Sequence, residues 1–513
     1  MNSLTLARHS LQAHEPSAGW SAWLMRQGYQ HLLLLRSQIN LYYFWEKRWF
    51  FFVLVFGGLF LTLPPPTGLS QQGWVLLIMS AASTILFITQ PIPLPSVALL
   101  IVIGQVLLVG LDSDEVAGNL MTDSVLFIMG SLMLAVAVVK QKLDKRIAWA
   151  IVRITGTRTV NICFGITLVC GLMASFIGEH TVAAMMLPVG LTLISLTNQN
   201  PARIPKLSAF ILFSIVFGCT MAGIGTPSGG ARNAIMIDYW QQFFYVPDDP
   251  STRRYLVDYL TWMAYGYPLF LAQIIFVTPI LYYTFKPERL DLSRAVARLR
   301  VQIELDGPMT PAAWLSIILF IGVMLGWIFA SQLVGMGIVA LMGTCAFLVT
   351  GLVKWEDINA GVNWGVVLLY AAAISLGVEM QATGAASWLA GQVLALFEPL
   401  GMGHGIGLLA GIALLTAVVA NTMAPGAAVA VLGPIVLKLA GPAEADPIQI
   451  GFMTAFASAF AYLAVASSPA STIIFSSGFL QIGDFLRIGW RMALMSMAML
   501  LLQAKFLWPW LAQ

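Results

Sequence analysis

Two long apolar stretches of this chain, residues 159–198 and 401–440, are each interrupted near the middle by a short polar triplet. The first triplet is Glu179–His180–Thr181 and the second is Ala420–Asn421–Thr422. Backbone that leaves the helical conformation cannot lie unpaired in lipid, so it needs a protein-lined or watery cavity. Interruptions at matching places in the two halves of a hydrophobic chain are typical of the binding site of a membrane transporter.

The composition places most of the chain in an apolar environment. Hydrophobic residues make up 59% of the 513 residues and charged residues only 10%, whereas a soluble domain averages about 25% charged residues. The sequence therefore predicts an all-α, multi-pass membrane protein embedded in a lipid bilayer. The net charge of +3 is too small to indicate a nucleic-acid partner. The four cysteines fall inside apolar stretches and lack the spacing of zinc ligands.

The charges of the loops set the expected topology. Residues 1–48 lack the apolar core and cleavage site of a signal peptide, and their basic excess predicts a cytoplasmic, interfacial segment before a first span at 49–72. The acidic loop at 112–123 is expected outside, and the basic loop at 140–158 is expected inside. We therefore expect a cytoplasmic N-terminus and an external C-terminus, in a bacterial inner membrane.

The same order of structural elements is expected in both halves of the chain. A first repeat at 73–284 and a second at 312–513 are joined by a cytoplasmic linker at 285–311. Each repeat has spans of a scaffold, then an interrupted hairpin, a broken helix and a final span. The hairpins are 159–198 and 401–440, and the broken helices are 207–237 and 449–480. The loop charges make the second repeat enter from the opposite side, which predicts inverted repeats with about eleven transmembrane helices and two opposed re-entrant hairpins.

Four motifs around the interruptions follow one another in a fixed order. They are Ser175–Phe–Ile–Gly–Glu–His–Thr–Val–Ala–Ala–Met–Met–Leu–Pro188, Gly223–Ile–Gly–Thr–Pro–Ser–Gly–Gly–Ala–Arg–Asn–Ala–Ile235, Thr416–Ala–Val–Val–Ala–Asn–Thr422 and Ser468–Pro–Ala–Ser471. In this order they resemble the divalent anion/sodium symporter (DASS) family, over roughly residues 50–510. The resemblance implies a secondary active transporter for di- or tricarboxylates, sulfate or a related anion. It also implies a homodimer in which a hairpin-bearing domain moves as an elevator past a scaffold.

The chain departs from the family pattern at both hairpin tips, which marks it as a divergent member. The family has Ser-Asn-Thr at each tip, where side-chain and backbone oxygens hold the anion and help to coordinate sodium. Here Glu179 and His180 replace the first Ser and Asn, and Ala420 replaces the second Ser. The family's Pro-Pro-Asn after each helix break becomes Ala231–Arg232–Asn233 in the first half and Ala470–Ser471 in the second.

Glu179 and His180 are the only acidic, basic or histidine side chains between residues 159 and 198. An ionisable group at membrane depth is costly unless it is paired. The two side chains therefore either form a structural pair that locks the tip, or they line the substrate cavity and relay a proton. Histidine titrates near physiological pH, which suits proton linkage. Either sodium or a proton is accordingly expected as the coupling ion, and exchange is the alternative to coupled uptake.

Arg232 is the only charged residue between Leu207 and Ile237. Three roles are open: an interfacial arginine, a partner of Glu179, or a bidentate clamp for a carboxylate or sulfonate of the substrate. Glu179 would oppose a simple anion, or would favour a substrate that carries an amine as well as a carboxylate. Asn421 and Thr422 provide neutral donors and acceptors, which suit either a carboxylate or an alkali cation.

Two overlapping sets of site residues follow from these motifs and the resemblance. The expected substrate-binding residues are Glu179, His180, Thr181, Ala420, Asn421, Thr422, Arg232, Asn233, Pro469 and Ser471. The expected cation-binding or coupling residues are Ser175, Glu179, His180, Gly225, Thr226, Thr416, Ala420, Asn421 and Ser468. Sodium is expected at the second half-site only, because that tip keeps most of its oxygen donors, and no other cofactor is expected. The alternative function is a membrane-embedded enzyme that uses Glu179 and His180 as acid and base.

Overall fold

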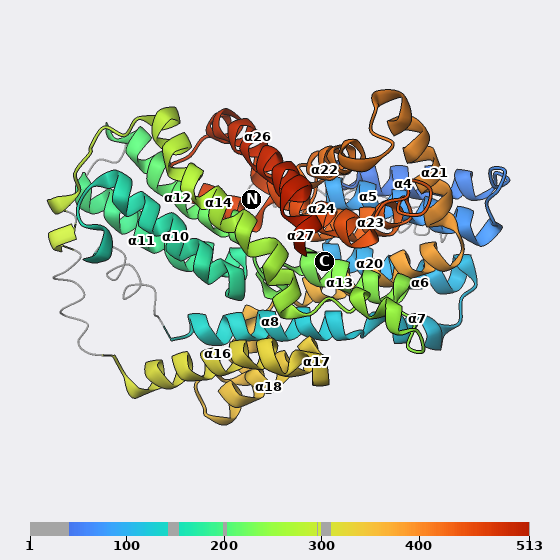
Figure 1. Ribbon diagram of the computed structural model, residues 1–513, viewed down its shortest axis with the longest axis horizontal. Coiled ribbons are helices and arrows are strands. Elements are labelled where there is room, and N and C mark those ends of the chain that lie inside the picture. Colours follow the sequence, from blue (N-terminus) through green and yellow to red (C-terminus); the bar gives the residue numbers. More distant parts are fainter. Residues whose placement is uncertain (1–40, 142–152, 199–202, 295, 299–308, 512–513) are drawn as a thin grey trace, which may run out of the picture.

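Helices make up most of the described part of the chain. The computed structural model describes residues 41–141, 153–198, 203–294, 296–298 and 309–511 (Figure 1). In these ranges an isolated bridge between Arg158 and Asp291 is the only β-type pairing. Eight of the described helices are long and apolar enough to cross a membrane, or up to ten if each of two bent pairs counts as one span. The prediction of an all-α polytopic membrane protein is confirmed. Most of the expected segment at 1–48 and part of the expected linker at 285–311 lie outside the described residues.

The first half opens with a series of apolar helices. These are α3 (Leu41–Glu46), α4 (Arg48–Leu61), α5 (Gln71–Thr89), α6 (Leu94–Gly104) with a π-helical end (Gln105–Val109), the short α7 (Ser113–Leu120) and α8 (Asp123–Val139). Hydroxyl side chains mark two of their starts, since Ser70 accepts the N–H of Gly73 and Thr122 accepts the N–H of Val125. Such caps satisfy N–H groups that have no partner within the helix.

A hairpin, a broken helix and a long helix complete the first half. The hairpin is α10 (Thr159–Ile177) and α11 (Glu179–Thr197). The broken helix is α12 (Pro205–Ala222), a 3-10 turn (Pro227–Gly229) and α13 (Ala231–Phe244), and the long helix is α14 (Tyr259–Phe285), which follows a 3-10 segment (Pro250–Tyr255). The hairpin reverses at one residue, Gly178, whose φ of 90° and ψ of 147° are open to glycine and strained for other residues.

The second half repeats this order. Its elements are α16 (Pro311–Phe329), α17 (Ser331–Val334), α18 (Met336–Val349), α19 (Trp355–Gly361), α20 (Trp364–Ala382), α21 (Ala385–Phe397), a 3-10 turn (Glu398–Leu400), α22 (Gly405–Ala420), α23 (Pro425–Leu437), α24 (Pro447–Ala457), two 3-10 turns (Ser458–Phe460 and Val465–Ser467), α25 (Pro469–Phe475), α26 (Ile482–Phe506) and α27 (Trp508–Leu511). Helix α21 was not expected from the sequence. It turns by 116° into the first arm of the hairpin formed by α22 and α23.

The two halves exchange equivalent contacts. Helix α8 packs against α18, and α20 packs against α6 in the same way. The short α7 contacts α20, and the short α19 contacts α8. Figure 1 shows α16, α17 and α18 gathered along one side of α8. The contact between α8 and α18 is thus repeated, with the halves exchanged, between α20 and α6. The contact between α7 and α20 is repeated in the same way between α19 and α8.

The hairpins and broken helices follow the same rule. Helix α11 of the first hairpin packs against α25, which follows the second break. Helix α13, which follows the first break, packs against α23 of the second hairpin. The tip of the first hairpin, both breaks and the start of α23 therefore come together inside the molecule.

An ion pair outside the spans joins the end of α8 to α19. The Lys140 ammonium lies 2.5 Å from a carboxylate oxygen of Asp357. The hydrogen bond from Lys140 and a backbone N–H bond from Lys354 hold the pKa of Asp357 below its ordinary value. Both groups are partly exposed, so this pair makes only a small contribution to stability.

Candidate functional site

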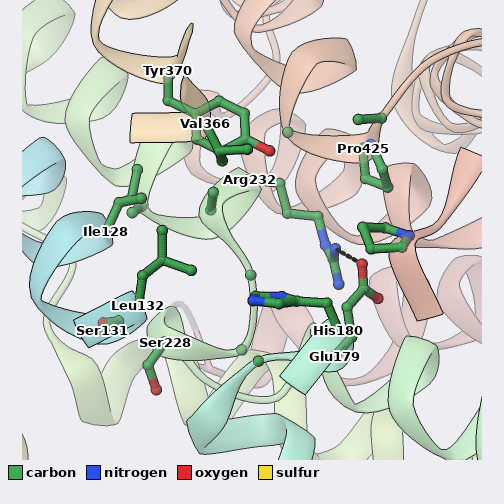
Figure 2. Close-up of a pocket in the computed structure, with 18 of the residues that line it drawn as sticks. Ile128, Ser131, Leu132, Glu179, His180, Ser228, Arg232, Val366, Tyr370 and Pro425 are labelled. Carbon is green, nitrogen blue, oxygen red and sulfur yellow. Dashed lines mark ion pairs between the residues drawn. The ribbon is translucent and has the colours of Figure 1, made fainter. Parts of the chain in front are cut away.

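A cavity of about 290 Å³ lies where the two halves meet. Figure 2 shows Glu179, His180 and Arg232 together, with Ile128, Ser131 and Leu132 of α8 and with Val366 and Tyr370 of α20 on other sides. The remaining lining residues are Leu94, Phe127, Ile177, Gly178, Pro227, Ser228, Gly229, Gly230, Ala231, Ala234, Asn363, Leu369, Ala424, Pro425, Gly426 and Pro469. Most of this wall is apolar, and its charged groups come from the first hairpin tip and the first break.

Several helices begin at this cavity, among them one from the first hairpin tip, one from the first break and one from the second hairpin. Helix α11 starts after Gly178, α13 after Gly230 and α23 after Ala424, and residues of all three first turns line the cavity. No side chain caps any of these starts. The N–H groups of a first turn have no partner within the helix, and the helix dipole places partial positive charge there. Three such ends make the cavity chemically suited to an anion.

Gly178 shapes the first of these ends. A side chain at this position would be strained by the backbone, and its Cβ would lie 3.5 Å from Cε1 of His180. The imidazole of His180 therefore folds back over the glycine at the tip. This arrangement leaves Glu179 directed toward the first break, where Figure 2 shows it facing Arg232.

Glu179 and Arg232 form a loose, buried ion pair. The distance from Oε1 of Glu179 to Nη1 of Arg232 is 4.0 Å, and the side chains are 8% and 2% exposed. The other carboxylate oxygen of Glu179 and the Nε and Nη2 atoms of Arg232 are buried without a hydrogen-bond partner. Of the three roles left open for Arg232, its burial excludes the interfacial arginine. Its geometry places it beside Glu179.

Protein groups close the first break internally. Ser175 Oγ donates to the carbonyls of Gly171 and Ala222, at 3.0 and 3.2 Å, and the Thr226 hydroxyl donates to the Ser175 carbonyl. The Asn233 amide donates to the carbonyls of Gly223 and Thr226, both at 2.7 Å.

Gly225, which was expected, and Ser228, which was not, also lie at this break. The Ser228 hydroxyl is 2.8 Å from that of Tyr259. Gly225 packs so closely that a Cβ there would lie 3.1 Å from Ser175 Oγ. The structure thus brings Ser175, Gly225 and Thr226, three of the residues expected to bind or couple a cation, together in one cluster.

At the second hairpin tip, Asn421 and Thr422 were expected to bind substrate, but their side chains bond to the protein itself. The Asn421 amide donates to the carbonyls of Ala417 and Phe460, at 2.8 and 3.2 Å, and accepts the N–H of Leu463 at 2.9 Å. Its side chain therefore fastens the hairpin to the second break. Thr422 donates to its own helix, at the carbonyl of Val419. The lining of the cavity includes neither Asn421 nor Thr422.

The remaining expected residues divide between the cavity and the protein interior. Pro469 lines the cavity, whereas Thr181, Ala420, Asn233 and Ser471 are absent from its lining. Thr416 and Ser468, on the second hairpin and the second break, are buried, and the hydroxyl of each lacks a hydrogen-bond partner. Buried hydroxyls are normally satisfied, so these two oxygens are free to serve a ligand.

Sequence reasoning missed the contribution of the scaffold helices. Ser131 and Asn363 supply polar groups to the cavity. Tyr370 packs on the start of α23, where a Cβ on Gly426 would lie 2.5 Å from the tyrosine oxygen. Ser131 and Tyr370 sit in uninterrupted apolar helices and Asn363 directly precedes α20, and no local pattern distinguishes them from packing residues.

Comparison with known proteins agrees with this architecture. The model of a family described as the sodium:sulfate symporter transmembrane region matches residues 45–513. A protein named sodium-dependent dicarboxylate transporter SdcS, from Staphylococcus saprophyticus, is 25% identical over 481 residues, which cover 88% of this chain and 89% of the relative. The sodium-dependent high-affinity dicarboxylate transporter 3 of Caenorhabditis elegans is 25% identical over 449 residues, 79% of this chain and 77% of the relative.

Two solved structures share the fold at low sequence identity. Neisseria gonorrhoeae MtrF, which is described with a class of antimetabolite efflux pumps, has a TM-score of 0.53 and 12% identity, and the match covers 85% of this chain and 95% of that one. The Alcanivorax borkumensis YdaH transporter has a TM-score of 0.51 and 13% identity, over 78% and 90% of the two chains.

Proposed function

The chain belongs to the sodium:sulfate symporter family, and on that basis we propose that it is a secondary active transporter of a small anion. The expected substrate class is a di- or tricarboxylate, sulfate or a related anion, in line with the names of its relatives. The observation that supports this most directly is the convergence of three helix N-termini on one cavity beside Arg232. The enzyme alternative is dropped, because the family and the relatives are transporters.

We further propose an elevator mechanism in a homodimer. The moving unit would consist of the two hairpins, the two broken helices, α14 and α26, and the fixed scaffold would include α8 and α20. The position of the cavity supports this division, since its charged side comes from the hairpin unit and its apolar side from α8 and α20. The proposed setting is a bacterial inner membrane, with inverted repeats, a cytoplasmic N-terminus and an external C-terminus.

We propose that substrate transport is coupled to fewer sodium ions than it would be if both half-sites bound sodium. The second half-site would take a sodium ion, with Thr416 and Ser468 as ligands, because their buried hydroxyls have no protein partner. Hydroxyl and carbonyl oxygens suit a hard cation. The first half-site would not take sodium in the same way. Three means of making up the difference are open: exchange, a proton carried by Glu179 and His180, or a fixed positive charge of the protein.

Reconstituted protein tests this function. Liposomes containing the purified protein would be assayed for uptake and counterflow of labelled succinate, citrate and sulfate, with sodium chloride or choline chloride at equal ionic strength. We expect saturable uptake and counterflow of at least one anion. An absence of both, from protein that unfolds cooperatively on heating, would refute the proposal.

A further inference from the structure

The two half-sites are built on the same plan but differ in their unsatisfied groups. Ser175 and Thr416 occupy the same place, four residues before Glu179 and Ala420 at their respective tips. Ser175 donates to two backbone carbonyls, whereas the hydroxyl of Thr416 has no partner. The first hairpin is therefore complete without a ligand at this point, and the second is not.

The breaks show the same contrast. In the first break the Ser228 hydroxyl lies 2.8 Å from that of Tyr259 and 3.1 Å from that of Thr226. In the second break the Ser468 hydroxyl is buried and has no partner. Each buried polar atom without a partner needs an explanation. A small cation explains the two orphaned hydroxyls of the second half-site. In the first half-site the orphaned oxygens are Oε2 of Glu179 and Oδ1 of Asn233, while its hydroxyls have partners.

A side-chain cation occupies the first break instead. The guanidinium of Arg232 lies over the two glycines that end α12 and begin α13, so that a Cβ on Gly223 would overlap it and a Cβ on Gly230 would lie 3.0 Å from Nη1. Arg232 is the only basic residue that is buried in the described part of the chain. Its Nη1 atom is the one nearest to Glu179, and its Nε and Nη2 atoms are buried without a hydrogen-bond partner.

We propose that Arg232 is a tethered cation, which does in the first half-site what a dissolved sodium ion does in the second. This inference rests on the proposed transport function and assigns the coupling of that same site. Glu179 provides the matching negative charge at 4.0 Å. The pair keeps the first half-site neutral while the hairpin unit crosses the bilayer, where an unbalanced charge is costly. The transporter then carries one dissolved cation fewer per cycle.

Removing the guanidinium should convert this place into a sodium site. In Arg232→Ala the Glu179 carboxylate would be left buried beside the carbonyl oxygens of the break. Carboxylate and carbonyl oxygens are the ligands that hard cations prefer. A buried charge that has lost its partner is strongly destabilising. Sodium should therefore raise the midpoint of thermal unfolding of the detergent-solubilised variant by more than it raises that of the wild type.

Matched variants separate charge from folding defects. Glu179→Gln/Arg232→Ala removes both charges, so it should respond to sodium as the wild type does. Arg232→Lys keeps the positive charge and should also keep the wild-type response. Arg232→Gln retains more of the side-chain volume and serves if the alanine variant does not fold. Each protein is compared in sodium chloride and in choline chloride at equal ionic strength.

Uptake assays provide a second test with the same variants. With labelled succinate as the probe, uptake by Arg232→Ala should depend more steeply on sodium than wild-type uptake. In choline chloride it should fall on the order of a hundredfold, as a lost buried partner implies. The thermal measurement needs no substrate, so it tests the tethered cation even if the chain proves not to transport succinate.

Three results would overturn the proposal. One is an Arg232→Ala variant, or Arg232→Gln in its place, that sodium stabilises no more than the wild type. Another is unchanged sodium dependence with a raised half-saturation for succinate, which would make Arg232 a substrate clamp. The third is wild-type uptake that changes with pH and becomes flat in Glu179→Gln, which would make Glu179 a proton carrier.

Discussion

The effect of the Thr416→Val substitution on stability should change sign when sodium is added. Valine has nearly the shape of threonine and lacks the hydroxyl. In the wild type that hydroxyl is buried and has no hydrogen-bond partner. A buried polar group without a partner costs ~1–3 kcal/mol. In sodium-free buffer Thr416→Val should therefore be at least as stable as the wild type, and about 1 kcal/mol more stable at the lower end of that range.

Sodium should invert the order of the two proteins. A ligand at 100 times its dissociation constant stabilises the folded state by ~2.7 kcal/mol. If Thr416 is one of the sodium ligands, the wild type gains this stabilisation and the variant loses most of it. The wild type should then unfold at the higher temperature in sodium and at the same or a lower temperature without it.

The assay is thermal unfolding of the solubilised protein across a sodium titration, with choline chloride holding the ionic strength constant. Thr454→Val is the control, because Thr454 is equally buried and its hydroxyl donates to the Ile450 carbonyl at 2.8 Å. That variant should shift by the same amount with and without sodium. If Thr416→Val destabilises the sodium-free protein as Thr454→Val does, or keeps the full sodium response, the second half-site has been assigned to the wrong oxygens.

Three further predictions concern the hairpin tips and pH. Gly178→Ala should lower the unfolding midpoint and uptake, because the backbone strain is ~1–3 kcal/mol; Gly118→Ala, which has open space around it, should change neither. Asn421→Ala should destabilise more than Thr422→Ala, since the amide makes three hydrogen bonds worth ~1 kcal/mol each, two of them between hairpin and break; equal effects on stability would contradict this fastening role. The lowered pKa of Asp357 stabilises the fold above its unfolded pKa of about 3.9 and loses that effect as pH falls through the lower folded value. Asp357→Asn should therefore be less stable than the wild type at neutral pH, converge with it in acid, and keep the wild-type profile of uptake between about pH 5.5 and 8, the range that brackets histidine.

The architecture was largely readable from the sequence, because interruptions of apolar stretches leave a mark in the residue pattern. The polar triplet at Glu179 and the glycine-rich run from Gly223 are visible without a structure, and both fall at helix ends. Helix α21 was missed because its 13 residues are too few to form a span.

The chemistry at the site was less readable, because it depends on partners distant in the chain. Asn421 was expected to bind substrate, but its amide bonds residues of the second break, about 40 positions further on. Tyr370 carried no local mark at all, since its role comes from contact with Gly426 of another helix. The pairing of Glu179 with Arg232 was one of several arrangements that the motif spacing allowed, and only the packing of the tip against the break selects it.

The cavity can attract an anion although it contains a carboxylate, because a neighbouring positive charge balances that carboxylate. Glu179 alone would repel a dicarboxylate or sulfate. Its charge is matched by Arg232 at 4.0 Å, and the titratable groups that line the cavity besides this pair are His180 and Tyr370. The three helix ends each contribute roughly half a positive charge. The ion pair does not cancel this positive contribution, so the cavity retains an attraction for an anion. The same reasoning explains why the pair must stay together during transport: without Arg232, the carboxylate would consume most of the positive potential on which substrate binding depends.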